Sequence, residues 1–251
     1  MEICSIALDP IEKKPLARFY PGSRILSVGG VGCTLHCPWC QNHEIALPED
    51  PSAVPTRTIT PDELAEAAAS YIPYGNIGVA YTYNEPLLRW RQVLECAKAV
   101  RAQEAPDLVG PDHLVNVLVT NGMVGEGPLE ELLEWIDAWN IDLKAFTQEG
   151  YDVCGGKLDV VKRTIRRAAA CSHVEVTTLV IPGYNDDMDG FERAAAWLAD
   201  VDPDLTWHLS RFHPAYRWMH LPRTPLDTLY RAQEIARRHL NHVVLGNVPL
   251  A

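Results

Sequence analysis

The chain has 251 residues, 47% of them hydrophobic, and a formal net charge of −11 at pH 7. This length is enough for one sizeable domain, and the composition excludes a disordered chain. The acidity argues against a nucleic-acid partner, because binding to a phosphate backbone needs clustered Lys and Arg. No apolar run is long enough to cross a bilayer, and Met1–Pro10 lacks the regions of a signal peptide. We therefore expect a cytoplasmic location and no membrane partner.

Short β-branched runs alternate with amphipathic stretches along the chain. The predicted strands are Ile25–Val28, Ile77–Thr82, Leu114–Thr120, Asn140–Leu143, Val174–Ile181 and Thr206–Phe212. The predicted helices are Leu64–Tyr71, Leu87–Gln103, Pro128–Trp139, Leu158–Cys171, Gly190–Leu198 and Pro225–His239. Alternation of this kind is typical of a parallel sheet with right-handed crossovers.

Six such units predict an α/β fold, a partial (β/α)6 TIM-like barrel of parallel strands rather than a closed eight-fold barrel. The apolar run Val243–Leu245 predicts a seventh strand at the edge of the sheet. No linker interrupts the pattern. We therefore expect a single domain over residues 1–251, with residues 1–23 as an N-terminal extension packed on the barrel.

Three cysteines stand close together directly after the first predicted strand. Cys33, Cys37 and Cys40 follow a C-x3-C-x2-C spacing. Three thiolates on one tight loop could hold three corners of a cubane iron–sulfur cluster and leave the fourth iron open to a small molecule. A zinc site completed by His43 is the alternative, but a second Cys or His pair across a turn is missing. The odd total of seven cysteines argues against a disulfide framework.

Polar residues follow each of the six strands, and the carboxyl ends of parallel strands meet at one rim. We therefore expect these residues to converge on one site. They are the cysteine motif, Tyr83-Asn84-Glu85-Pro86, Thr120-Asn121-Gly122, Asp142 with Lys144, Pro182-Gly183, and His213.

These motifs resemble a known superfamily. The chain is similar to the radical S-adenosylmethionine (SAM) enzymes, whose motif is C-x3-C-x-Φ-C, and Trp39 occupies the aromatic position Φ. Within that superfamily it resembles the pyruvate formate-lyase (glycyl-radical-enzyme) activases, and above all the radical enzyme of the AmmeMemoRadiSam system. The segments that carry this resemblance are DPIEKKPL (9–16), FYPGS (19–23), CQNHEI (40–45), YTYNEP (81–86), IDLKAF (141–146), CGGKL (154–158), TTLVIPGYND (177–186), FHP (212–214) and GNVP (246–249).

The resemblance implies a reaction. Cys33, Cys37 and Cys40 would hold a 4Fe–4S cluster that reductively cleaves SAM, and the resulting 5′-deoxyadenosyl radical would abstract hydrogen from a substrate. A one-electron reductant such as flavodoxin or ferredoxin would be a partner. The substrate, a small molecule or a protein, is not identified. The alternatives are an activase that installs a glycyl radical on a partner enzyme, and a metal-stabilised binding protein without catalysis.

The resemblance also implies roles for side chains around SAM. Trp39 would shield the cluster near the adenine, or would be a plain core tryptophan. Glu85 would bind the methionine ammonium, with Tyr83 and Asn84 in place of two glycines of the superfamily pattern. The alternative for Glu85 is a helix cap.

Further contacts to SAM are implied on the later strands. Thr120, Asn121 and Asp142 would line the ribose and methionine region, where related activases also bind a monovalent cation. Lys144 could pair with Asp142 or with a carboxylate of the ligand. The other implied neighbours of SAM are Thr177, Leu179, Ile181 and His213, although Leu179 and Ile181 could equally be core residues.

Two features stay open. The segment 207–220 is rich in aromatic and imidazole groups, and Arg211, Tyr216, Arg217, Trp218 and His220 could form a substrate lip or could simply pack. Cys154 is a candidate catalytic residue, because a thiol beside two glycines could donate a hydrogen atom or contact substrate. An unreactive buried thiol is the favoured alternative for Cys154.

Overall fold

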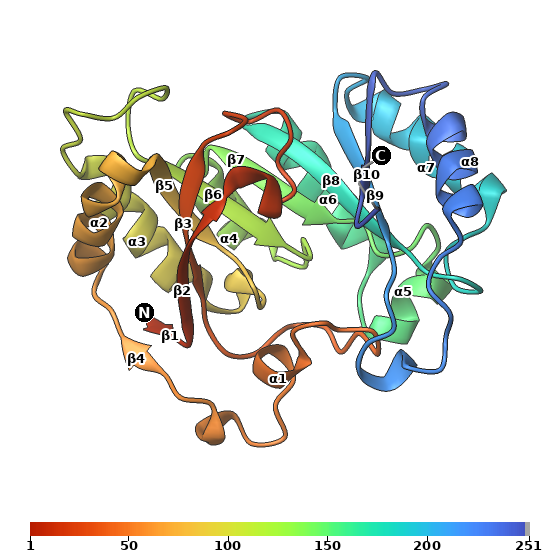
Figure 1. The fold of residues 1–251 in the computed structure, drawn as a ribbon, viewed down its shortest axis with the longest axis horizontal. Helices are drawn as coiled ribbons and strands as arrows, with labels where there is room; N and C mark the ends of the chain where they lie inside the picture. Colours follow the sequence, from red (N-terminus) through yellow and green to blue (C-terminus); the bar gives the residue numbers. More distant parts are fainter. Residues whose placement is uncertain (249–251) are drawn as a thin grey trace.

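An eight-stranded sheet forms the centre of the molecule, in the order β10-β9-β8-β7-β6-β5-β3-β2 (Figure 1). The computed structural model describes residues 1–248, so Pro249 of the GNVP segment and the end of the expected 1–251 domain lie outside the described residues. The strands from β3 to β10 pair in parallel, and β2 pairs with β3 antiparallel. Their bounds are β2 Ser5–Pro10, β3 Arg24–Gly29, β5 Asn76–Tyr81, β6 Val115–Thr120, β7 Ala138–Asp142, β8 His173–Val180, β9 Thr206–Arg211 and β10 His242–Gly246.

The predicted α/β fold, a partial barrel of parallel strands, is confirmed. Each of the six predicted strands is present, and β10 is the expected seventh strand at the edge. Strand β2 was not predicted, nor was the small ribbon of β1 (Glu2–Ile3) with β4 (Arg57–Thr58). The sequences of β2 and of the β1–β4 ribbon are interrupted by polar residues or proline, so they carry no strand pattern of their own. These segments become extended only by pairing with a distant strand.

The helices occupy the predicted segments with one clear error. The predicted helix Pro128–Trp139 ends at Leu133, because the chain turns there and Ala138–Asp142 joins the sheet as β7. Helices α1 and α5 were not predicted. The helix bounds are α1 His43–Ala46, α2 Pro61–Ser70, α3 Trp90–Ala102, α4 Glu126–Leu133, α5 Gln148–Cys154, α6 Leu158–Ala169, α7 Met188–Val201 and α8 Leu226–Ala236. None of the helices within residues 1–248 combines the length and apolarity that a bilayer span requires.

Helix α2 shows how local sequence starts an element. The Thr60 hydroxyl accepts a bond from the Glu63 amide, and the Glu63 carboxylate accepts one from the Thr60 amide. Pro61 occupies the first helical position, where its missing N–H costs nothing. On α6, Arg163, Arg166 and Arg167 form a solvated helix face and are paired to surface carboxylates.

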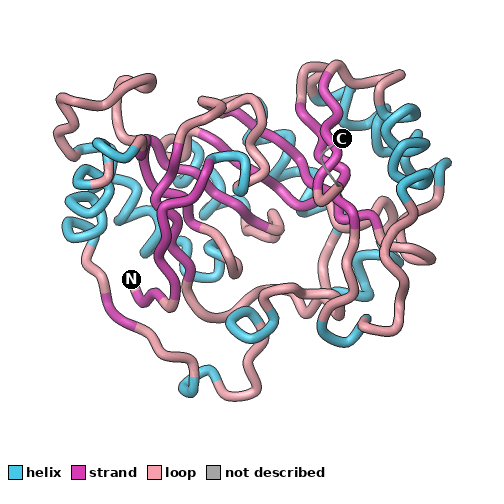
Figure 2. Tube along the Cα trace, in the orientation of Figure 1, coloured by secondary structure: helices cyan, strands magenta, loops and turns pink. Residues whose placement is uncertain are grey.

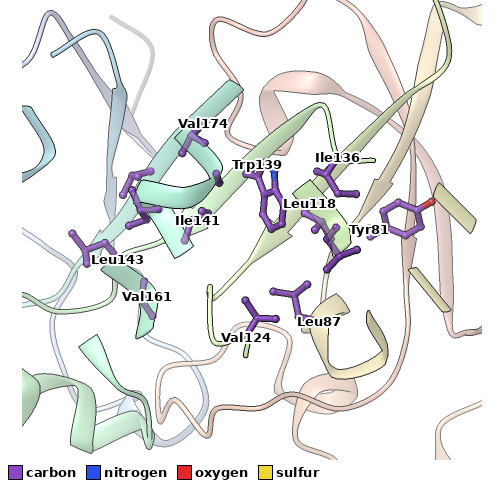
Figure 3. Packing of buried hydrophobic residues seen from close by; sticks show 14 of the residues in the cluster. Tyr81, Leu87, Leu118, Val124, Ile136, Trp139, Ile141, Leu143, Val161 and Val174 are labelled. Carbon is purple, nitrogen blue, oxygen red and sulfur yellow. The ribbon is translucent and has the colours of Figure 1, made fainter. Parts of the chain in front are cut away.

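Alternate residues along the strands pack into two different hydrophobic clusters. Leu118 and Trp139 belong to the large core between sheet and helices, which Figure 3 shows from close by. Their neighbours Val117 and Ala138 belong to a second cluster on the opposite face, which is the inside of the partial barrel. This period of two is what a strand buried on both faces requires.

The N-terminal segment fills the inside of the barrel. Ile11 and Leu16 are fully buried in the second cluster. The Glu175 carboxylate on β8 accepts hydrogen bonds from the amides of Ala17 and Arg18, at 2.9 and 2.8 Å. Asn140 on β7 donates to the carbonyl of Pro15 at 2.8 Å. Residues 11–18 therefore form a floor across the barrel. Figure 2 shows this segment as a loop with one short helical turn beside the strands.

Glu175 is charged although it is fully buried. Burial alone would raise its pKa, but hydrogen bonds from His173, His208 and the two amides outweigh that effect and lower the pKa from its ordinary value to about 2. The folded state thus binds the proton of Glu175 less tightly than the unfolded state does. The stability that this carboxylate contributes is present above its unfolded pKa and is lost as pH falls toward 2.

We predict that Glu175→Gln lowers the free energy of unfolding at pH 7 by about 2–4 kcal/mol, because the floor loses a charged acceptor for four donors. The difference from the wild type should shrink as pH falls from about 4.5 to 2. Urea unfolding at several pH values measures the loss of unfolding free energy and its dependence on pH. Glu130→Gln, in an exposed pair with Arg167, is the matched control and should change little. A loss that is independent of pH in this window would contradict the assignment.

Candidate active site

A cavity of about 370 Å³ lies at the carboxyl edge of the sheet, between the strand ends, the N-terminal floor and the cysteine loop, residues 33–40. The loop follows β3 and is orange in Figure 1. Thirteen of the predicted site residues line this cavity: Cys33, Cys37, Trp39, Cys40, Tyr83, Asn84, Glu85, Thr120, Asn121, Asp142, Lys144, Thr177 and Leu179. The predicted polar residues after the first four of the six predicted strands therefore converge on one cavity, whereas Pro182-Gly183 and His213, after the fifth and sixth, are not among the residues that line it.

The cysteine loop presents its three sulfurs to one space. The amide of Leu35 donates to the sulfur of Cys33 at 3.4 Å, and the side-chain amide of Asn121 approaches the same sulfur at 3.7 Å. Such donors stabilise a sulfur that carries negative charge. Burial raises the pKa of Cys33 to about 11, and the adjacent Cys154 thiol together with burial raises that of Cys37. Without a metal, these groups remain thiols.

Residues 1–248 contain no closed set of side chains for the alternative zinc site. In residues 1–248, no three His, Cys, Asp or Glu side chains come close enough together to hold a single metal ion. His43 forms a hydrogen bond with the carbonyl of Cys40 at 3.2 Å, and its ring stacks on Tyr216. Structural zinc needs four ligands about 2 Å from one centre. Three separated sulfurs around one cavity suit a larger inorganic group better.

Asn84 holds the backbone that leads into the cysteine loop. Its side-chain oxygen accepts a bond from the amide of Gly30, and its side-chain nitrogen donates to the carbonyl of Gly32, both at 2.9 Å. Tyr83 adopts a left-handed φ of 69° just before it. This unusual conformation for a residue with a side chain allows the strand end to turn toward the glycines. The side chain of Asn84 therefore positions the loop, and both of its polar atoms are engaged in doing so.

Glu85 is a buried carboxylate with a partly satisfied shell. Its Oε1 accepts from the Thr120 hydroxyl at 2.7 Å and from the Leu87 amide at 2.9 Å, and its Oε2 accepts from the Asn121 amide at 2.8 Å. The predicted alternative of a helix cap is thus present, because Glu85 caps the 3-10 turn η4, Pro86–Arg89. Within residues 1–248, Oε2 accepts only the bond from the Asn121 amide, so it keeps capacity for a second donor. Burial raises the pKa of Glu85 to about 7 against the opposing effect of these bonds.

Asp142 and Lys144 form an ion pair in the cavity wall. Their charged atoms are 2.9 Å apart, so the structure shows the pairing with Asp142 that the sequence left open. Burial opposes the charge on Lys144, but the adjacent Asp142 carboxylate outweighs that effect and raises the pKa of Lys144. The monovalent cation that the resemblance implies near Thr120 and Asp142 would meet this ammonium group there.

Aromatic side chains cover the outer side of the cysteine loop. Trp39 packs against Trp218 and Tyr184, with ring centroids 4.8 and 4.7 Å away. The Arg217 amide donates to the carbonyl of Pro38 at 2.9 Å. The segment after β9 is therefore a cover for the loop. Trp39 both packs and lines the cavity, so its two predicted roles coexist.

Three predicted site residues do not line the cavity. Ile181 is fully buried in the large core, as its core alternative states, and His213 is half-buried beyond the end of β9. Cys154 is fully buried behind the cysteine loop, and its sulfur donates to the carbonyl of Tyr151 at 3.2 Å. The thiol contacts Cys37 rather than the open part of the cavity. The geometry therefore supports the structural interpretation of Cys154.

Comparison with known proteins identifies the family. A family model described as the radical SAM superfamily matches residues 27–195. The chain belongs to the radical SAM superfamily. It is 36% identical over 251 residues to an uncharacterised protein of Methanocaldococcus jannaschii, covering 99% of this chain and 71% of that relative. The family's enzymes use a 4Fe–4S cluster and SAM, and they need a reductant.

Solved radical SAM structures share the fold. A domain of the pyruvate-formate lyase-activating enzyme of Bacteroides vulgatus superposes with a TM-score of 0.57 at 18% identity, over 68% of this chain and 99% of that one. SuiB of Streptococcus suis bound to S-adenosylmethionine superposes with a TM-score of 0.62 at 14% identity, over 88% of this chain and 51% of that one. At these identities the likeness shows the architecture alone.

The residues present fit a radical SAM site. Three thiols from one loop line the cavity, and donors already approach the sulfur of Cys33. A carboxylate with a spare lone pair stands at the adjacent strand end. These are the groups that a thiolate-held cluster and an amino-acid ligand would require.

The same cavity has a second end that the sequence did not reveal. Lys13, Lys14 and Pro15 line it, together with Ser210 on β9 and Asn247 after β10. The DPIEKKPL segment carried part of the resemblance, yet nothing in its pattern assigned a role to its lysines. Adjacent lysines normally indicate a solvated surface. A buried lysine is found only when the fold is known.

We predict that Asn84→Ala loosens the approach to the cysteine loop. Loss of partners for the amide of Gly30 and the carbonyl of Gly32 should cost about 1–3 kcal/mol of stability. Amide hydrogen exchange should accelerate within residues 28–34, as read by peptide mass spectrometry. The exposed Gln41→Ala is the control and should leave exchange unchanged. Unaltered hydrogen exchange in Asn84→Ala would contradict the role of Asn84 in holding the backbone before the cysteine loop.

Proposed function

We propose that this chain reductively cleaves SAM and uses the 5′-deoxyadenosyl radical so produced to abstract hydrogen from a substrate held in the same cavity. The observation that supports this most directly is the presence of three cysteine sulfurs, a buried carboxylate and an ion pair around one cavity at the carboxyl edge. Membership of the superfamily supports the cofactors. The proposal includes a cytoplasmic location, because the three thiols must stay reduced, and a donor such as flavodoxin or ferredoxin.

Each group of side chains around the cavity would have its own role in this reaction. Cys33, Cys37 and Cys40 would hold the cluster, which together with SAM supplies the electron transfer and the radical chemistry. Glu85 would accept a hydrogen bond from the methionine ammonium through Oε2. Asp142 and Thr177 would contact the more polar parts of SAM, and Leu179 an apolar face. Trp39 and the cover above it would exclude water from the site.

A small molecule is the favoured substrate class. An activase would need a groove that admits an extended loop of its partner enzyme. Here residues 13–15 bound the cavity on its inner side, and the floor below them is packed with Ile11 and Leu16. SuiB of Streptococcus suis, which shares the fold, has been solved bound to a precursor peptide. In this chain the closed base of the cavity favours a metabolite over an extended protein loop, and the proposal is therefore an enzyme of the AmmeMemoRadiSam type that acts on a metabolite.

We predict that the reconstituted protein, reduced with dithionite under anaerobic conditions, forms 5′-deoxyadenosine and methionine from SAM. Chromatography with mass detection measures both products. Cys37→Ala, reconstituted in the same way, should fall to background because the cluster loses one of its three ligands. Cys171→Ala removes an exposed thiol and is the matched control, expected to match the wild type. Product formation by Cys37→Ala at the wild-type rate would contradict the proposal.

We also predict that Glu85→Gln weakens SAM binding by about tenfold or more, because a charge-assisted bond to an ammonium contributes about 1.5–3 kcal/mol. Equilibrium dialysis with labelled SAM measures the dissociation constant on cluster-loaded protein. The exposed Glu44→Gln, near the cysteine loop, controls for a general loss of negative charge. Equal affinity of Glu85→Gln and wild type, with cluster content unchanged, would remove Glu85 from the SAM site.

A further inference from the structure

Lys14 is a buried cation at the second end of the cavity. Only 2% of its surface is exposed, and it lines the cavity beside Pro15. Its Nζ lies 2.8 Å from the Asp9 carboxylate and 4.4 Å from the centre of the Tyr83 ring. The Tyr83 hydroxyl donates to the same Asp9 carboxylate. Lys14 is therefore held in place on two sides.

This fixed ammonium group has bonding capacity left. An ammonium has three N–H donors, and the Asp9 carboxylate accepts one of them. The Tyr83 ring takes a second direction by a cation–π contact, which is weaker than a hydrogen bond to a charged acceptor. A buried charge with a free donor is costly unless a further partner completes its shell. Residues 1–248 supply no second hydrogen-bond acceptor to Nζ.

The charges at this end of the cavity are unequal. Lys13 and Lys14 both line it, and both contact the single carboxylate of Asp9, at 3.4 and 2.8 Å. Asp9 can balance only one of these two charges, and within residues 1–248 no other carboxylate forms an ion pair with either lysine. A ligand group with one negative charge would restore the balance, whereas a phosphate would bring close to two. Thr82 and Ser210 add hydroxyl groups to the same lining.

We propose that the substrate of this enzyme is a small molecule carrying a carboxylate, and that Lys14, on the N-terminal floor of the cavity, binds that carboxylate. The proposal rests on the proposed function, because it assigns the lysine end of the cavity to the molecule that loses hydrogen. Asp9 and Tyr83 are positioning residues for Lys14. Lys13, 68% exposed in its side chain, contributes charge at the mouth.

Binding of a carboxylate probe tests the subsite without turnover. Trifluoroacetate is titrated by ¹⁹F NMR into cluster-loaded, oxidised enzyme saturated with SAM, and the neutral trifluoroacetamide is its matched control. We expect trifluoroacetate to bind and the amide not to bind. Lys14→Met should weaken trifluoroacetate by about tenfold or more. Because that variant leaves Asp9 unpaired, Asp9→Asn/Lys14→Met serves as the better-folded second variant and should show the same loss.

Transfer of deuterium tests the substrate class. Wild-type enzyme is given metabolite extract from cells of the source organism grown in D₂O, separated into anionic, neutral and macromolecular fractions. We expect deuterium in 5′-deoxyadenosine with the anionic fraction only, and loss of that transfer after carbodiimide and methylamine convert its carboxylates to amides. Asp9→Asn/Lys14→Met should still form unlabelled 5′-deoxyadenosine but lose the transfer, whereas Lys98→Met, which removes an exposed lysine outside the cavity lining, should keep it.

The outcomes separate the two proposals. Absence of any 5′-deoxyadenosine from the wild type would overturn the proposed function. Transfer from the neutral or macromolecular fraction, transfer from no fraction while SAM is still cleaved, or unchanged transfer in Asp9→Asn/Lys14→Met would overturn the carboxylate assignment and leave SAM cleavage standing. Equal binding of trifluoroacetate to wild type and variants, or binding to neither, would also overturn it.

Discussion

The buried Glu175 carboxylate is the interaction on which the shape of the site depends. It accepts two backbone amides of the N-terminal segment and hydrogen bonds from His173 and His208 on β8 and β9. An open sheet of parallel strands would otherwise leave its inner face to solvent. Because one charged group ties the segment to two strands, residues 11–18 become a floor. The partial barrel thereby becomes a cavity with a closed base.

The cavity joins two chemical environments. At the carboxyl edge of the sheet, sulfur groups, the Glu85 carboxylate and the Asp142–Lys144 pair stand together, each held by backbone or neighbouring side chains. At the inner end, the floor brings Lys14 with its partner Asp9. A radical is indiscriminate, so its target must be held in a defined place while water is kept out. Fixed charges on the floor of the cavity are a means of holding a substrate there.

Much of the fold and of the candidate site could be predicted from particular residues. The β-branched runs placed β3 and β5–β10, and the polar residues that follow them lie around one cavity because parallel strands end at one edge. Strand β2 could not be predicted, because its polar and proline-containing sequence becomes extended only by pairing with β3. The helix predicted from Pro128 to Trp139 extends beyond the observed end of α4 at Leu133, since Leu, Trp and Ile suit a helix and a buried strand equally well. Ile181 and His213 follow strands, yet lie outside the cavity lining.

The sequence by itself determined the chemistry of the cysteine loop, the alternation of elements and the edge of the sheet where the site lies, because spacing and periodicity are local properties. Only the tertiary structure decided that Asn84 holds the loop, that Glu85 is buried with an acceptor site to spare on Oε2 and that Lys14 is buried beside Asp9. These facts depend on contacts between segments as many as 74 residues apart, such as Tyr83 with Asp9. No local pattern records which distant group will satisfy a given charge.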